Sequence, residues 1–176
     1  MVKLQRLGKD RITNYEIFLL GVPTIDDIPA QIQVPSTRFV CLLAMDARPV
    51  SVATIASVAE RLLNSGCAYF CCWGPDCERV HDIVDEVIVG SGVTPIEWGG
   101  VMTTWHDKDS LQEAVDFFLW SAAPDSAHAQ RCASGVALRV GNEFDVVELE
   151  LEVVARMNNP PSNPPLQRSA AQRPLS

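Results

Sequence analysis

The chain lacks the glycine signatures of the common nucleotide-binding and hydrolase α/β domains. None of the patterns G-x-G-x-x-G, G-x-x-x-x-G-K-[ST] and G-x-S-x-G occurs among its 176 residues. The first two patterns let backbone amides approach a phosphate, and the third exposes a nucleophilic serine at a sharp turn. Their absence argues against a dinucleotide-dependent dehydrogenase, a P-loop NTPase and a typical α/β hydrolase, and no cofactor is predicted.

Long apolar runs are also missing. No run approaches the roughly 18 residues that a membrane-spanning helix needs. The first 11 residues are basic, but no apolar segment of the kind found in signal peptides follows them. We therefore expect no membrane association, and the simplest predicted location is the cytoplasm.

Basic residues are few relative to acidic ones. The chain has 14 Lys and Arg against 22 Asp and Glu, a net charge of −8. Residues 157–176 contain two arginines and no acid, which leaves about −10 for residues 1–156. An acidic domain repels phosphate backbones, so nucleic acid is not an expected partner. The alternative interpretation of the acidity is that it only keeps the protein in solution.

No C-x-x-C pair is present, which argues against a zinc ribbon or a thioredoxin-type redox motif. Several of the cysteines lie inside apolar runs typical of strands, where a thiol behaves as a small hydrophobic group. The six cysteines are Cys41, Cys67, Cys71, Cys72, Cys77 and Cys132.

Apolar runs alternate with helical patterns through the middle of the chain. Residues 38–45 and 67–73 are continuous apolar runs, which is typical of strands buried on both faces, and residues 99–105 are predicted to form a third strand. Each run is followed by helix-start residues and apolar positions at i, i+3, i+4 and i+7. For the third helix, Ser110 and Glu113 form the sequence pattern of a capping box. This order predicts a three-layer Rossmann-like or flavodoxin-like α/β domain with a mostly parallel sheet.

Three regions are expected along the chain. Residues 1–37 contain one strand-like segment, residues 15–20, and then three prolines that predict a loop wrapping the domain. Residues 38–156 form the α/β domain. Residues 158–176 are rich in proline and lack an apolar pattern, so we expect a disordered tail.

The segment 143–155 fits two structures. Residues 148–153 alternate between acidic and apolar side chains, which favours an antiparallel C-terminal strand after a turn at Gly141 and Asn142. Alternatively, Asn142 caps a helix. The apolar face of that helix would be Phe144, Val147, Leu151 and Val154. We favour the strand.

Polar side chains follow the predicted strands at the points where they end. Because the carboxyl ends of parallel strands share one edge of a sheet, we expect these side chains to lie close together, where open α/β sheets bind ligands. The candidate ligand-binding residues are Arg48, Trp73, Gly74, Asp76, Thr104 and Trp105. A simpler role for Asp46 and Arg48, at the end of the first run, is an ion pair.

A catalytic triad is conceivable at the same edge. Cys77 lies in the first turn of a predicted helix, where backbone amides favour a thiolate. His106 could then act as the base and Asp46 could orient it. The alternative is that Cys77 is a packed, inert thiol on the buried side of its helix. His106 would then belong to an ordinary polar turn.

A zinc site is a further interpretation of the same residues. Cys77 and His81 are four residues apart on one predicted helix, so their side chains can meet. With His106, and with Asp46 or Asp76 as fourth ligand, they would supply zinc-binding groups. Spacing alone does not define such a site, and no metal is predicted.

Two segments resemble a small family of uncharacterised bacterial α/β proteins. They are residues 73–82 (WGPDCERVHD) and 102–107 (MTTWHD), and the resemblance covers roughly residues 38–122. It implies a bacterial, stand-alone, single-domain protein. The family has no established activity, so the resemblance assigns no catalytic residue.

Together these observations predict a binding or interaction module rather than a recognisable enzyme. We expect a small polar ligand or a protein partner at the carboxyl edge of the sheet. The alternative is a hydrolase or transferase that uses Cys77 and His106. Oligomeric state is not determined by any of these patterns.

Overall fold

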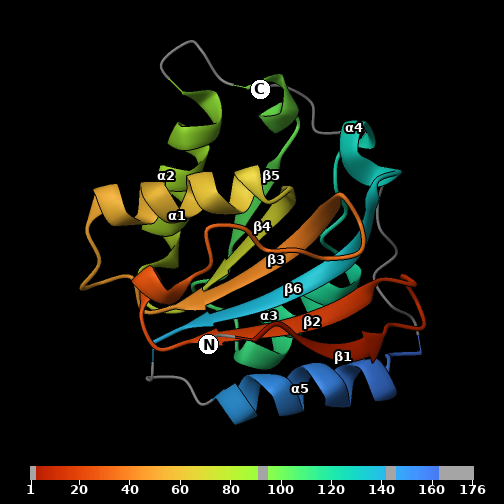
Figure 1. The fold of residues 1–176 in the computed structure, drawn as a ribbon. Helices are drawn as coiled ribbons and strands as arrows, with labels where there is room; N and C mark the ends of the chain where they lie inside the picture. Colours follow the sequence, from red (N-terminus) through yellow and green to blue (C-terminus); the bar gives the residue numbers. More distant parts are fainter. Residues whose placement is uncertain (1–2, 91–94, 142–145, 163–176) are drawn as a thin grey trace, which may run out of the picture.

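A computed structural model describes residues 3–90, 95–141 and 146–162, which form a six-stranded sheet between two layers of helices (Figure 1). The strands are β1 (Gln5–Lys9), β2 (Glu16–Val22), β3 (Arg38–Met45), β4 (Cys67–Trp73), β5 (Met102–Trp105) and β6 (Cys132–Val140). The helices are α1 (Val52–Asn64), α2 (Cys77–Val89), α3 (Leu111–Trp120), α4 (Ser126–Ala129) and α5 (Val146–Asn158). Two short 3-10 turns, η1 (Ile25–Asp27) and η2 (Ile96–Trp98), complete the described elements.

The strand order is β1-β2-β6-β3-β4-β5. Every neighbouring pair is parallel except β1 with β2, which is antiparallel. The predicted mostly parallel, Rossmann-like sheet is confirmed. The antiparallel strand is at the N-terminal end of the chain rather than at the C-terminal end. No described helix has the length and apolar character that a bilayer crossing requires.

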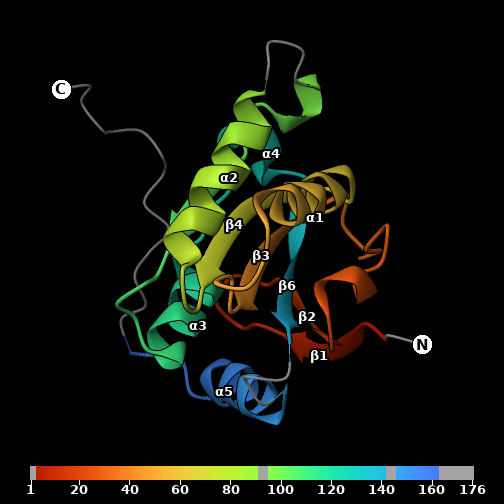
Figure 2. The ribbon, with the colours of Figure 1, turned by 90° about the vertical axis from the view of Figure 1, so that its left-hand side faces the viewer.

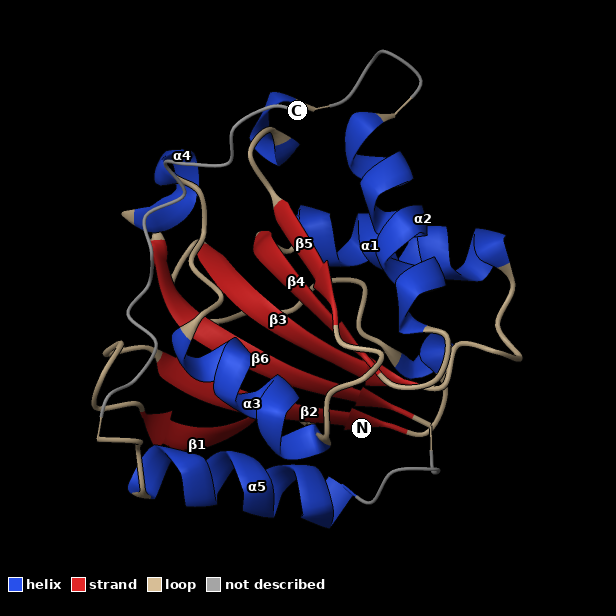
Figure 3. Cartoon of the chain, turned by 180° about the vertical axis from the view of Figure 1, so that it is seen from behind, coloured by secondary structure: helices blue, strands red, loops and turns tan. Residues whose placement is uncertain are grey.

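The helices divide between the two faces of the sheet. In Figures 1 and 3, which show opposite sides, α1 and α2 cover one face and α3 and α5 cover the other. Figure 2 shows α1 beside α2 and α5 beside α3. Strand β3 is buried along its whole length, as its continuous apolar run predicts, with Phe39 facing one helical layer and Val40 the other.

The helix starts follow local chemistry. The Ser110 hydroxyl accepts a hydrogen bond from the Glu113 amide, and the Glu113 carboxylate accepts one from the Ser110 amide, so the predicted capping box is confirmed. Helix α1 is capped by Ser51. Helix α2 begins at Cys77, after Asp76 in the left-handed conformation at φ 66°, with no side-chain cap.

The favoured strand at residues 148–153 is wrong, because this segment lies inside α5. Leu149 and Val153 are buried one helical turn apart, against the layer that contains α3. Leu151, which a strand would place on the same face as Leu149, is 63% exposed, whereas Leu149 is 2% exposed. The alternative prediction, a helix, had the wrong buried face. Its predicted cap, Asn142, is outside the described residues.

Strand β1 was not predicted. Its sequence, QRLGK, contains one apolar residue, and it pairs with β2 at the edge of the sheet with an irregular register at Arg6 and Gly8. Hydrogen bonding to β2, rather than an apolar pattern of its own, explains why it is a strand. Residues 163–176 of the predicted disordered tail are outside the described residues.

Candidate functional site

The carboxyl ends of β3, β4 and β5 lie side by side, so their polar loops share one edge of the sheet. The Ala47 amide donates a hydrogen bond to the Pro75 carbonyl at 3.0 Å, which joins the loops after β3 and β4. The His106 amide donates to the Cys72 carbonyl at 3.0 Å, which joins the end of β5 to β4. Residues about 30 positions apart in the sequence therefore form one continuous edge.

Arg79 of α2 connects the first two loops. Its Nε donates to the Asp76 carboxylate at 2.6 Å, and its Nη2 donates to the carbonyls of Ala47 and Val50. Asp76, a predicted ligand-binding residue, thus orients an arginine that holds two loops together.

Asp46 and Arg48 form a bidentate ion pair. Nε and Nη2 of Arg48 lie 2.9 and 2.5 Å from the two Asp46 carboxylate oxygens. The carboxylate is buried, whereas the arginine is mostly exposed. This agrees with the simpler of the two roles considered for these residues.

Gly74 permits the close approach of the loops after β3 and β4. Its φ is +114°, and a Cβ atom there would lie 2.3 Å from the Met45 carbonyl oxygen. No other residue fits this position without a backbone shift. Gly74, one of the predicted ligand-binding residues, therefore has a clear structural role.

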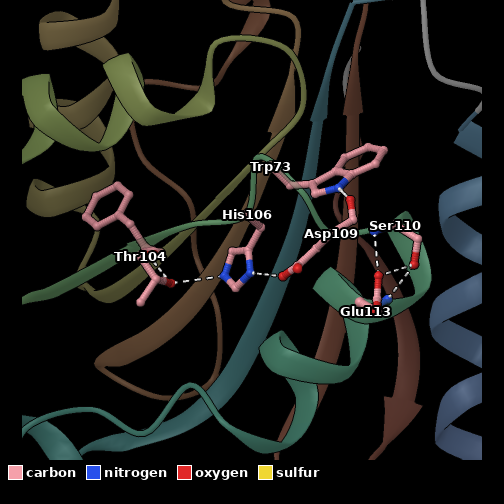
Figure 4. A network of polar contacts seen from close by, with 7 residues as sticks. Trp73, Thr104, His106, Asp109, Ser110 and Glu113 are labelled. Atoms are coloured by element: carbon pink, nitrogen blue, oxygen red, sulfur yellow. Dashed lines mark hydrogen bonds and ion pairs between the residues drawn. The ribbon is translucent and has the colours of Figure 1, made fainter.

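The imidazole of His106 is the centre of a hydrogen-bonded network (Figure 4). Its Nδ1 lies 2.7 Å from the Asp109 carboxylate and its Nε2 lies 3.1 Å from the Thr104 hydroxyl. The Trp73 indole N–H donates to the Asp109 backbone carbonyl at 2.9 Å. The imidazole also packs on Phe117 of α3, with ring centroids 4.6 Å apart. Three predicted site residues, Trp73, Thr104 and His106, are thus brought together.

Asp109 was not among the predicted site residues, although it is central to this network. Two signals in the sequence could have identified it: it follows His106 by three positions and immediately precedes the Ser110 cap. The capping box of Ser110 and Glu113 holds the start of α3, as Figure 4 shows, and so fixes the position of Asp109.

Successive residues of β5 point to opposite faces of the sheet. Thr103 donates to Asp85 of α2 at 2.6 Å, and the Trp105 ring lies 4.5 Å from the His81 ring of α2. Thr104 and His106 face α3 instead. The sheet therefore separates Trp105 and His81 from the His106 network, although all of these residues lie near the same edge.

The structure does not bring Cys77, His106 and Asp46 together. Cys77 is buried in the apolar core beneath α1 and α2, whereas the His106 imidazole lies on the α3 face. Burial raises the pKa of the Cys77 thiol above its ordinary value, and a hydrogen bond involving the His106 backbone opposes this only in part. The geometry is that of the packed thiol considered as the alternative.

The residues considered as zinc ligands also lie on opposite faces of the sheet. His81 lies on the α2 face and the His106 imidazole on the α3 face. Within residues 3–90, 95–141 and 146–162, no three His, Cys, Asp or Glu side chains form a group that could hold a metal ion.

Arg139 of β6 is a second residue that sequence reasoning missed. It is a buried arginine, in register with Ala44 of β3 and Gly21 of β2. The chain leaves β3 towards α1 on one face and continues from β6 to α5 on the other. The carboxyl ends of these two strands are therefore the topological switch point at which open α/β sheets bind ligands. An arginine within the apolar run of β6 was the available signal.

The chain belongs to the family described as a domain of unknown function, DUF7684, whose sequence model matches residues 20–153. A search of curated proteins and a search of solved structures found no match to the chain. The family relationship assigns no chemistry to the residues of this edge.

Proposed function

We propose that the protein is a binding module for a small polar ligand, at the carboxyl edge of the sheet on the face covered by α3 and α5. The network of Trp73, His106 and Asp109 carries this proposal. Both ring nitrogens of His106 have partners, so the imidazole holds Asp109 in place instead of acting as a base. The Asp109 side chain is 41% exposed, which leaves carboxylate surface for a hydroxyl or amino group of a ligand.

Arg139 supports the same location. Arg139 is a buried cation at the switch point. It lies on the same face of the sheet as Trp73, because both residues are in register with Ala44. A ligand whose donor groups face the exposed Asp109 carboxylate would match this location. The six cysteines are buried and none forms a disulfide, which supports a reducing, cytoplasmic environment.

The enzymatic alternative has less support. A cysteine nucleophile requires its base within hydrogen-bond reach, but the Cys77 thiol and the His106 imidazole lie on opposite faces of the sheet.

The test is a ligand screen with a matched pair of variants, Asp109→Asn and Asp107→Asn. Amino acids, small amines and polyols are titrated while backbone amide shifts are followed by NMR. A ligand should shift the amides of residues 104–109, and Asp109→Asn should weaken its binding about tenfold, because a charge-assisted hydrogen bond is lost. Asp107→Asn, in the same loop, should bind normally. Equal affinity in both variants, or shifts confined to other regions, would contradict the proposal.

A protein-interaction role is the second candidate, and Trp105 favours it. This indole is 44% exposed on β5, an edge strand in the described sheet. Open edge strands pair readily with strands of other chains. If the partner is a second copy of the chain, sedimentation velocity should show a dimer, and Trp105→Ser should dissociate it. A monomer at every concentration would refute this candidate.

A further inference from the structure

The opposite edge of the sheet, where the parallel strands begin, carries a polar pocket of about 630 Å³. It lies between the segment 31–38, the end of α1, the turn η2 and Arg131. Strands β3 and β6 both begin near α4 at this end of the molecule (Figure 1). None of these residues belongs to the carboxyl-edge site, so the pocket needs an explanation of its own.

Arg38, the first residue of β3, lines this pocket although it is only 5% exposed. Its Nη2 donates to the Glu97 backbone carbonyl at 3.0 Å. In the described part of the chain, no carboxylate forms an ion pair with Arg38. A carbonyl oxygen satisfies one N–H group but leaves the positive charge uncompensated, and a buried charge normally has a counter-charge.

Arg131 supplies a second guanidinium at the pocket wall. Its Nη2 donates to the Ala127 carbonyl at 3.1 Å and lies 3.4 Å from Nδ1 of His128. His128 is buried, and its Nε2 donates to the Gly99 carbonyl at 2.7 Å, which leaves Nδ1 as an acceptor for the arginine. Arg131 is thereby oriented by the His128 ring, and it too forms no ion pair with a carboxylate among the described residues.

The two arginines repel each other across the pocket. Burial, followed by the nearby charge of Arg131, lowers the pKa of Arg38, and Glu97 opposes this only in part. Glu97 is the only acidic residue in the described lining of the pocket. Two guanidinium groups against one carboxylate make this pocket locally positive in a chain whose net charge is −8.

We propose that this pocket binds the oxyanion group, phosphate or carboxylate, of a small molecule, with Arg38 and Arg131 as its charged donors. Guanidinium groups match the geometry of both oxyanions. Thr37 and Ser65 are among the residues that line the pocket, and its volume is typical of sites for small metabolites. The site is independent of the one proposed at the carboxyl edge.

The experiment is a backbone NMR titration of the full chain with inorganic phosphate and, separately, with succinate, at constant ionic strength. We expect saturable shifts at the amides of Ser65, Gly66 and Arg131. Arg131→Gln should weaken binding about tenfold, through loss of a charge-assisted contact at an exposed position that folding does not require. Glu97→Gln should strengthen binding, because it removes a negative charge that repels the anion. Arg6→Gln, which removes an exposed arginine elsewhere, should bind as the wild type does.

The outcomes separate clearly. Tighter binding of phosphate or of succinate identifies the preferred oxyanion and supports the proposal in either case. Non-saturable shifts, equal affinity of the wild type and Arg131→Gln, or saturable shifts at residues 104–109 alone would overturn it. The last outcome would still be compatible with the carboxyl-edge site, so the two proposals can fail separately.

Discussion

Nδ1 of His106 lies 2.7 Å from the carboxylate of Asp109, across the turn that joins β5 to α3. The carboxylate accepts a hydrogen bond from Nδ1–H, and Nε2 then faces the Thr104 hydroxyl. The pair links the last residues of an edge strand to the first residues of a helix. The position of α3 on the sheet, and the exposed face of Asp109, both depend on it.

Replacement of His106 by alanine should therefore destabilise the protein. The variant loses two partly buried hydrogen bonds and the contact with Phe117, at an expected cost of about 2–4 kcal/mol in the free energy of unfolding. Urea denaturation measures this cost. His81→Ala, on the opposite face of the sheet, is the control and should cost about 1 kcal/mol or less. Equal losses in the two variants would show that the network does not stabilise the turn.

The helical structure of α5 predicts a strong difference between two leucines. Leu149→Ala should cost about 2–4 kcal/mol, because it leaves a cavity beneath α5. Leu151→Ala should change the free energy of unfolding by less than about 0.5 kcal/mol, since this side chain is exposed. A strand would place both side chains on one face, so similar losses in thermal or urea denaturation would contradict the helix.

Stability should fall at alkaline pH because of the buried thiols. Burial raises the pKa of Cys67, Cys71 and Cys72 well above the ordinary value of 9.0. The unfolded chain releases these protons near the ordinary value, whereas the folded chain keeps them. The free energy of unfolding should therefore be insensitive to these thiols below that value. Above it, the free energy should decline by about 1.4 kcal/mol per pH unit for each thiol, up to the folded pKa.

Urea denaturation between pH 7 and pH 10.5 under reducing conditions tests this dependence. Cys71→Ala should show a shallower decline than the wild type, because one buried titrating group has been removed. An unchanged slope in this variant would mean that the buried thiols are not the cause.

Gly74→Ala tests the close approach of two loops. A positive φ costs a non-glycine residue about 1 kcal/mol at this position and at Gly141 alike. At Gly74 the added methyl group also meets the Met45 carbonyl, whereas at Gly141 no atom of the described residues lies within 4 Å. We expect Gly74→Ala to cost about 1–3 kcal/mol more than Gly141→Ala in the free energy of unfolding. Similar costs would show that the loop after β4 can move away from β3 easily.

Sequence patterns predicted the central elements well, because burial on both faces leaves a clear mark. Continuous apolar runs identified β3 and β4, and the pair Ser110 and Glu113 identified the start of α3. Patterns were insufficient for β1 and α5. β1 has little apolar character, and the acidic-apolar alternation in α5 fits a strand as well as an exposed helical face.

For the candidate site, too, the sequence predicted some features and missed others. Sequence predicted that Trp73, Thr104 and His106 would meet at one edge, and they do. It could not show that Cys77 lies beneath the other helical layer, because a side chain's face depends on the register and twist of the whole sheet. The pocket around Arg38 was missed for a related reason, because the segments that line it are distant in the sequence. Asp109 was missed although its partner His106 is only three positions away.

Local composition and spacing were enough to locate the buried central strands and their polar ends, because a segment buried on both faces carries a continuous apolar run. The fold alone shows which polar ends share a face, and that Arg38 and Arg131 form no ion pair with a carboxylate among the described residues. Those relationships arise from strand order and from the two-sided geometry of a pleated sheet, in which neighbouring residues point in opposite directions.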